Sequence, residues 1–248
     1  MQEAPARHVH LEGASNFRDL GGYSTRDGRT LRWRQIFRSN HLGHLTETDI
    51  VAVRRLGVRH AFDFRGKQER AAAICRVAEI TVHSLPIEPT VVAALRARLA
   101  ISRLDAGDAL AIMQESYRNY VRHSSESFRT LFADLLEDRA PLVIHCTAGK
   151  DRTGFACALV LHALGVPDQV ISEDYLLTNR FYRRDPAAGT DLPEDVREAI
   201  GSVDPSYLSA GLDAIRADFG DLDGYFKYGL GIGATERAAL QARYLESA

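Results

Sequence analysis

The chain lacks the features that mark several classes of protein. It has three cysteines and one tryptophan in 248 residues, and its 31 basic side chains nearly balance 33 acidic ones. Three cysteines are too few, and odd in number, for the disulfide framework of a small secreted domain. A net charge of −2 lacks the basic excess of a general nucleic-acid-binding protein, so we expect no nucleic-acid partner.

Long apolar segments are missing as well. The sequence has no run of about 18 apolar residues, which argues against a spanning helix and against stable membrane insertion. The segment from Met1 to His8 has no apolar region of the kind that a secretory signal needs. A cytoplasmic location is therefore the default expectation, with export that needs no such signal left open. The histidines show no ligand spacing with cysteines or acids, so we expect neither a metal nor another cofactor.

What is present suits one globular domain. Hydrophobic residues make up 45% of the chain and charged residues 26%, as in ordinary folded proteins. The length fits a single domain, and no internal repeat, low-complexity tract or clear domain boundary interrupts it. We therefore predict one domain over residues 1–248, with two segments, 89–125 and 180–205, as possible lids over a site.

Apolar periodicity predicts an α/β fold with a small, mostly parallel central sheet flanked by helices. Strands are expected at 58–64, 79–85 and 142–145, and a turn at 26–29 predicts a hairpin into 31–37. Helices are expected from Thr46 to about Gly57, within 109–121 and 128–136, from Thr153 to Leu164, after Pro167, and over 205–219, 222–228 and 235–245. Residues 183–204 are rich in proline, glycine and acids, and we predict a flexible excursion there.

The stretch from Val143 to Gly154 organises the rest of the chain. Apolar β-formers end at His145 and Cys146, a loop of small residues follows, and then a long apolar helix begins. In a strand, tight loop and helix N-terminus of this kind, backbone N–H groups converge on one point, where the helix dipole adds positive potential. The stretch therefore predicts a phosphate-binding loop.

Two side chains give this loop a chemistry. Cys146 lies at its start, where loop amides, the helix N-terminus and the cations of Lys150 and Arg152 favour the thiolate. A thiolate under a bound phosphoryl group is placed for in-line attack, and Arg152 can hold two phosphate oxygens at once. The plain alternative is a buried cysteine beside a surface arginine.

The run from His145 to Gly154 resembles the phosphate loop of cysteine-dependent phosphatases. Its Gly-Lys-Asp-Arg variant resembles that of the atypical bacterial tyrosine phosphatases, which also accept phosphoinositides. Further matches to that family lie at 16–23, 36–39 and 63–65, so the resemblance covers nearly the whole chain. It implies a cysteine-phosphatase-like domain that hydrolyses phosphotyrosine through a phosphocysteine, with phosphoserine and phosphothreonine as further candidate substrates. The runner-up is a phosphoinositide lipid phosphatase, so the expected partner is a phosphorylated protein or a phosphoinositide.

The other loop residues receive supporting roles. The backbone of Thr147, Ala148 and Gly149 is expected to bind the phosphate, and Lys150 adds a cation that suits multiply charged ligands. His145 is expected to orient the loop by hydrogen bonding, with a neutral core histidine as the alternative. Thr153 can donate a hydrogen bond from its hydroxyl to the sulfur of Cys146, which helps the sulfur leave in the second step.

Two aspartates compete for the role of general acid. Asp63 ends a predicted strand, and carboxyl ends of strands in α/β sheets face the binding crevice; its alternative role is an ion pair with Arg65 or Arg38. Asp151 lies beside Arg152 in the loop itself, although the surrounding cations oppose its protonation. Asp151 is the closer candidate, and both are kept open.

Two rival functions use related chemistry. A sulfurtransferase also carries a loop cysteine, but typically in a shorter loop, and the Cys-x5-Arg-Thr spacing argues against it. A phosphate-binding module without turnover would lack the nucleophile or the arginine, and both are present. Cys157 and Cys75 are expected to pack in the core, with protection of Cys146 by a transient disulfide as the minor alternative.

Overall fold

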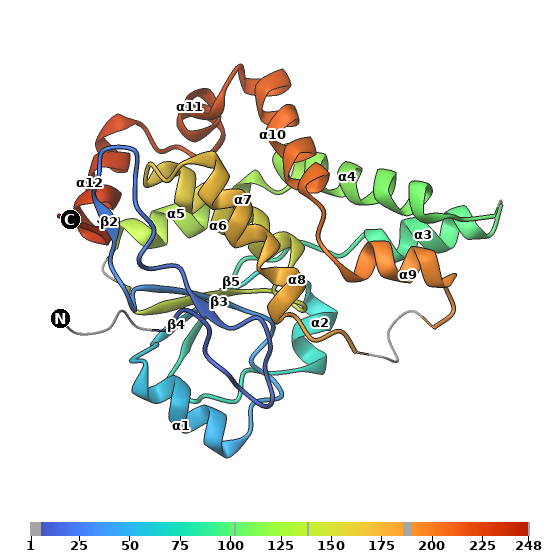
Figure 1. Ribbon diagram of the computed structural model, residues 1–248, viewed down its shortest axis with the longest axis horizontal. Helices are drawn as coiled ribbons and strands as arrows, with labels where there is room; N and C mark the ends of the chain where they lie inside the picture. The colour runs from blue at the N-terminus through green and yellow to red at the C-terminus, as the bar shows by residue number, and fades with distance from the viewer. Residues whose placement is uncertain (1–5, 102, 138, 186–189, 248) are drawn as a thin grey trace.

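A five-stranded sheet lies at the centre of the computed structural model, which describes residues 6–101, 103–137, 139–185 and 190–247 (Figure 1). Its strand order is β1-β3-β6-β4-β5, and only β1 runs antiparallel to its neighbour. The strands are β1 (Arg18–Asp19), β3 (Ile36–Ser39), β6 (Leu142–His145), β4 (His60–Asp63) and β5 (Thr81–Ser84). The fold is therefore α/β with a small, mostly parallel sheet, as predicted.

The register brings the carboxyl ends of the four parallel strands into one row. Ser39 and Asp63 both pair with His145, and Ser84 pairs with Asp63. The central strand β6 therefore delivers Cys146 to the middle of the sheet edge where ligands bind in open α/β folds.

Helices cover both faces of the sheet. In order along the chain they are α1 (Glu47–Arg55), α2 (Lys67–Ala72), α3 (Val91–Leu99), α4 (Ala106–His123), α5 (Ser125–Leu136), α6 (Asp151–Ala163), α7 (Asp168–Leu176), α8 (Thr178–Phe181), α9 (Glu194–Gly201), α10 (Pro205–Phe219), α11 (Leu222–Gly224) and α12 (Ala234–Tyr244), with a π-helical turn η1 (Tyr225–Gly229) after α11. Figure 1 shows α1 on one side of the sheet and α4 to α7 on the other.

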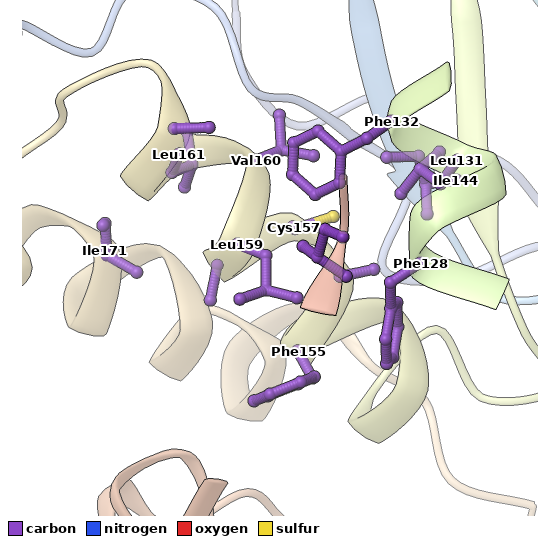
Figure 2. Close-up of a cluster of buried hydrophobic side chains, with 14 of the residues drawn as sticks. Phe128, Leu131, Phe132, Ile144, Phe155, Cys157, Leu159, Val160, Leu161 and Ile171 are labelled. Carbon is purple, nitrogen blue, oxygen red and sulfur yellow. The ribbon is translucent and has the colours of Figure 1, made fainter. Parts of the chain in front are cut away.

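Alternation along the strands builds two cores, because successive side chains of a strand point to opposite faces. Phe37, Ala61 and Val143 pack with residues of α1 on one face. Their neighbours in sequence, among them Phe62 and Ile144, pack on the other face against α5 and α6. Figure 2 shows this larger core, with Cys157 of α6 between aromatic and aliphatic side chains. Cys157 is fully buried, which confirms that it packs in the core.

Several local predictions are confirmed. Thr46 caps α1 in a reciprocal capping box with Asp49, and Gly57 follows with a φ of +75°, which glycine adopts easily. Strands β4, β5 and β6 fall inside the ranges predicted at 58–64, 79–85 and 142–145. Helix α6 begins at Asp151, two residues before its predicted start.

Two predictions need correction. The turn at 26–29 forms, with a bridge between Ser24 and Thr30, but 31–37 is not one strand. Instead, the short strand β2 (Thr30–Leu31) pairs with β7 (Leu245–Glu246), and the chain then turns into β3. The excursion predicted at 183–204 contains helix α9, although residues 186–189 lie outside the described part. Val196 of α9 is fully buried, so packing fixes a helix that local composition disfavours.

The predicted lid segments lie together at one end of the molecule, where α3, α4 and α9 project from the sheet (Figure 1). A small core joins them, made of Leu95, Leu104, Ala109, Leu192 and Val196. The second half of α4 belongs instead to the main core through residues such as Tyr117 and Val121. Across the described residues, no helix is both long and apolar enough to cross a membrane.

Candidate active site

The loop between β6 and α6 carries Cys146 and is held in a tight curve. Cys146 follows the last residue of β6 and is 2% exposed. Gly149 has a φ of +64°, and a Cβ at this position would lie 2.2 Å from the carbonyl oxygen of Ser39. Only glycine fits this close approach to β3. The curve therefore depends on a residue type that the sequence motif specifies.

Buried side chains from distant segments hold the carbonyl oxygen of Gly149. Asn16 donates to it from Nδ2 at 2.8 Å, and Arg38 donates from Nη2 at 3.1 Å. Asn16 itself has a φ of +59°, a left-handed conformation that asparagine tolerates better than most residues. The segments at 16–23 and 36–39 thus hold the phosphate loop through hydrogen bonds to the carbonyl oxygen of Gly149.

Asp174 of α7 joins two arginines under the loop. Its carboxylate accepts from Arg38 Nη1 at 2.9 Å and from Arg18 Nε at 3.1 Å, and all three side chains are almost fully buried. Burial alone would raise the pKa of Asp174, but the charges of Arg18 and Arg38 outweigh it and hold the pKa at about 2. The cluster therefore keeps two guanidinium groups and one carboxylate beneath the site.

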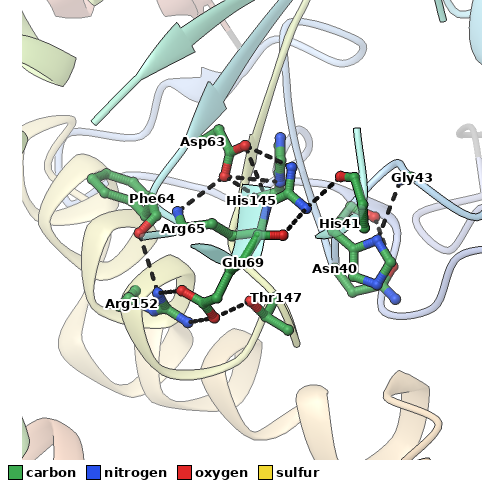
Figure 3. A network of polar contacts seen from close by, with 12 residues as sticks. Asn40, His41, Gly43, Asp63, Phe64, Arg65, Glu69, His145, Thr147 and Arg152 are labelled. Atoms are coloured by element: carbon green, nitrogen blue, oxygen red, sulfur yellow. Dashed lines mark hydrogen bonds and ion pairs between the residues drawn. The ribbon is translucent and has the colours of Figure 1, made fainter. Parts of the chain in front are cut away.

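Figure 3 shows Arg152, which is predicted to bind the phosphate, paired with a carboxylate group. Its Nη1 lies 2.7 Å from Glu69 Oε2, and its Nη2 lies 2.8 Å from Glu69 Oε1. Nη1 also donates to the carbonyl oxygens of Phe64 and Ile87, at 3.2 and 2.9 Å. The hydroxyl of Thr147 donates to Glu69 as well. Glu69 thus presents two oxygens to the arginine fork and the loop, as a phosphate group would.

Lys150 is turned toward helix α9. It is 3% exposed, and its Nζ donates to the carbonyl oxygens of Ser202, at 2.9 Å, and Ile200. The same nitrogen lies 3.7 Å from Asp151 Oδ2. The loop cation therefore binds the carboxyl end of α9, where exposed carbonyl groups favour a positive charge.

Asp151 is the first residue of α6 and remains partly exposed. Its Oδ1 lies 3.1 Å from the hydroxyl of Tyr117 on α4, which lies 2.7 Å from the hydroxyl of Tyr175 on α7. The carboxyl group is thus fixed at one oxygen while its residue borders the loop.

Asp63 is placed differently. Its carboxylate accepts from Arg65 Nε at 2.9 Å and Arg65 Nη2 at 2.8 Å, and the side chain is 1% exposed (Figure 3). Burial alone would raise the pKa of Asp63, but His145 and Arg65 lower it below its usual value. The ion pair with Arg65, one of the two alternatives left open for Asp63, is thus present.

His145 and Thr153 are both fully buried. His145 Nδ1 lies 3.7 Å from Asp63 Oδ1, and burial lowers the pKa of the imidazole. Among the described residues, no side-chain hydrogen bond is formed by either ring nitrogen of His145 or by the hydroxyl of Thr153. The hydrogen-bonding role of His145 therefore stays a prediction, with the neutral core histidine as its alternative.

Sequence reasoning missed three residues of this site. Glu69 lies four residues after Arg65 in a charged helix, where a solvent-facing role is the ordinary expectation. Tyr117 belongs to an apolar stripe that predicted only core packing. Asp174 had no signal of its own, because it lies in a helix with two other acids, Asp168 and Glu173, where solvent exposure is the ordinary expectation.

Comparison with known proteins places these features in a family. A model of the tyrosine phosphatase family matches residues 9–246. The triple specificity protein phosphatase PtpB of Mycobacterium tuberculosis is 30% identical over 88% of this chain and 92% of its own. A Cupriavidus necator protein whose name places it among the tyrosine-protein phosphatases is 31% identical over 96% of this chain and 89% of its own.

Solved structures resemble the chain more loosely. The catalytic core of Siw14 has a TM-score of 0.39 and 13% identity, covering 85% of this chain and 95% of its own. TpbA of Pseudomonas aeruginosa has a TM-score of 0.34 and 18% identity, covering 75% of this chain and 89% of its own. Scores this low establish no shared fold, so the family rests on the sequence matches.

Proposed function

The chain belongs to the tyrosine phosphatase family, and on this premise we propose that it hydrolyses phosphotyrosine in proteins through a phosphocysteine intermediate. Cys146 is the nucleophile, Arg152 binds the phosphoryl oxygens and Asp151 is the general acid. The backbone amides of 147–149 complete the phosphate cradle at the N-terminus of α6.

Two displacements at phosphorus make up the proposed reaction. The Cys146 thiolate attacks phosphorus, the bond to the tyrosine oxygen breaks, and Asp151 gives that oxygen a proton. Water then attacks the phosphocysteine, gives a proton back to Asp151, and releases phosphate and the thiolate. The buried hydroxyl of Thr153, unpartnered within the described residues, is available to donate to the departing sulfur.

The bidentate pair of Arg152 and Glu69 is the observation that carries this proposal. Both Nη atoms bond one carboxylate above the loop, at 2.7 and 2.8 Å. Two oxygens of a phosphoryl group have similar spacing and stronger charge. The guanidinium is therefore already arranged for the anion that the reaction requires.

The geometry favours Asp151 over Asp63 as the acid. Asp63 is buried, bonds Arg65 through both oxygens and has a lowered pKa, so it resists protonation. Asp151 is partly exposed and directly precedes Arg152, with one oxygen bonded to Tyr117. In this proposal the second oxygen gives its proton to a leaving group bound beside Arg152.

A broader substrate range is the second candidate function. Lys150 lies in the phosphate loop and would add a cation for phosphoinositide headgroups if its ammonium group left the carbonyl groups at the carboxyl end of α9. The name of the PtpB relative describes triple specificity. Activity on phosphoserine, phosphothreonine or phosphoinositides follows from the same loop if its pocket admits them. The phosphorylated substrate is the only partner that this proposal requires.

A panel of substrates tests the function. The protein should release phosphate from phosphotyrosine peptides and aryl phosphates, and Cys146→Ser should abolish both activities. Thiosulfate in the same assay probes the sulfurtransferase alternative. Sulfur transfer without phosphate release, or phosphate release that survives Cys146→Ser, would overturn the proposal.

A further inference from the structure

Three helices bring two buried tyrosines to the proposed acid. Tyr117 comes from α4, Tyr175 from α7 and Asp151 from the start of α6. The Tyr117 hydroxyl lies 3.1 Å from Asp151 Oδ1 and 2.7 Å from the Tyr175 hydroxyl. Tyr117 and Tyr175 are at most 1% exposed. The chain of oxygens therefore runs from the interior to the phosphate loop.

Counting protons fixes the direction of this chain. An ionised carboxylate accepts hydrogen bonds and donates none, so the Tyr117 proton points to Asp151. Tyr117 has no second proton, so the proton in its bond to Tyr175 belongs to Tyr175. Burial, with the charge of Asp151 adding to it, raises the pKa of both phenols well above the usual value, so both stay protonated at neutral pH.

The bond at Oδ1 decides where an acidic proton can reside. When Asp151 is protonated, an Oδ1 that still accepts from Tyr117 leaves Oδ2 as the oxygen that carries the proton. Oδ2 lies 3.7 Å from Lys150 Nζ, at the loop. Tyr117 thus holds Oδ1 and leaves Oδ2 as the oxygen that carries the proton.

Other groups near Asp151 have no such bond to it. Tyr120, Tyr182 and Tyr207 have raised pKa values, chiefly from burial and next from the charge of Asp151. Tyr207 donates instead to the carbonyl oxygen of Ala199. Of the described side chains, Tyr117 alone is hydrogen-bonded to the Asp151 carboxyl group.

We infer that Tyr117, supported by Tyr175, is a positioning residue that orients the carboxyl group of Asp151 for proton transfer to the leaving group. This inference rests on the proposed function and adds the residues that make its general acid effective. A merely structural tyrosine would fill the same space but would have no effect specific to the proton-transfer step.

The test compares leaving groups. Tyr117→Phe removes one hydroxyl and keeps the ring, so kcat on phosphotyrosine, whose leaving group has a pKa of about 10, should fall by about 10-fold. An aryl phosphate with a strongly acidic phenol needs little proton transfer, and its kcat should fall by less than about 2-fold. KM should change little for either substrate. Tyr175→Phe should give a smaller loss with the same leaving-group dependence.

Tyr225→Phe is the matched control. Tyr225 is fully buried, and its hydroxyl bonds Ser125 at 2.9 Å, away from the phosphate loop. Loss of this hydroxyl should leave the ratio of the two activities unchanged. Equal losses on both substrates in Tyr117→Phe would overturn the inference, because they would indicate general damage to the site.

A double variant separates this inference from the proposed function. If Tyr117 acts only through Asp151, Tyr117→Phe should cost no further activity on phosphotyrosine in an Asp151→Asn background. Additive losses would overturn the inference while leaving Asp151 as the acid. A lack of leaving-group dependence in Asp151→Asn would overturn both assignments, and Cys146→Ser would still report on the hydrolysis itself.

Discussion

The carboxylate of Glu69 occupies both Nη atoms of Arg152, the pair proposed to bind the phosphoryl group. Burial alone would raise the pKa of Glu69, but hydrogen bonds from Arg152 and Thr147 lower it, so the group stays charged. A phosphate dianion must therefore compete with it. Under the proposed function, substrate binding at Arg152 is therefore an exchange of the Glu69 carboxylate for a phosphate group.

Removing this competitor should strengthen phosphate binding. In Glu69→Gln the neutral amide keeps its size but attracts the guanidinium less, so inorganic phosphate should inhibit at about 5-fold lower concentration, roughly 1 kcal/mol. Inhibition constants measured against an aryl phosphate check this, with Glu47→Gln on an exposed helix as control. Weaker inhibition would mean that Glu69 instead holds Arg152 in its binding position.

The nucleophile and the clamp should respond differently to substitution. Cys146→Ser should lose more than about 95% of kcat yet keep phosphate binding and folding, because a serine hydroxyl stays protonated in this cradle. Arg152→Lys should recover little of the activity that Arg152→Ala loses, since an ammonium group cannot reproduce the planar fork. Calorimetric phosphate titration beside steady-state kinetics measures both. Substantial kcat in Cys146→Ser would contradict the covalent mechanism.

Between elements, Lys150 connects the phosphate loop to helix α9 through the carbonyl oxygens of Ile200 and Ser202. The predicted role of this lysine was recognition of extra negative charge. In the structure its ammonium group already has partners, so a polyanionic ligand would draw it away from α9 or be bound alongside it.

Lys150→Ala should therefore have two effects. Hydrogen exchange at the amides of 194–201 should speed up by about 5-fold, because the helix loses a charged group at its carboxyl end. Hydrolysis of phosphoinositides should fall more than that of an aryl phosphate. Lys67→Ala, on the exposed start of α2, serves as the control. Unchanged exchange would show that α9 is held by its apolar contacts alone.

The sequence predicted those elements that are determined by residues close together in the chain. The capping residues of α1 and the strand–loop–helix pattern around Cys146 are short-range signals, and both are present. Helix α9 was missed because the buried position of Val196 depends on α4, far away in sequence. For the same reason the roles of Glu69 and Asp174 could not be read from the sequence, since the arginines that they pair with are more than 80 residues distant.

At the scale of the molecule, the buried cluster of Arg18, Arg38 and Asp174 joins three parts of the chain. Asp174→Asn would leave two buried guanidinium groups without their counter-charge and should reduce stability by about 3 kcal/mol. Urea unfolding at pH 7 measures this. Asp168→Asn weakens an exposed pair with Arg26 and a 3.6 Å contact with His162 Nδ1, and it should cost under about 1 kcal/mol.

The carboxylate of Asp174 makes the free energy of unfolding depend on pH. The folded-state pKa of Asp174 is depressed to about 2, so its contribution is complete above the unfolded value of about 3.9 and declines as pH falls toward 2. The difference in stability between wild type and Asp174→Asn should therefore shrink between about pH 4 and pH 2. A difference that stays constant over this range would contradict the buried charge.

During translation, the phosphate loop is synthesised before several of the residues that pack against it. Cys146 and Arg152 leave the ribosome ahead of Asp174 and Tyr175, and well ahead of β7, which pairs with β2. At about 5–20 residues per second, the gap between Arg152 and Glu246 lasts roughly 5–20 s. Throughout that interval β2 lacks its partner strand, and in its first part Arg18 and Arg38 also lack the carboxylate of Asp174. Under the proposed function, we therefore expect phosphatase activity to appear only after translation has passed these residues.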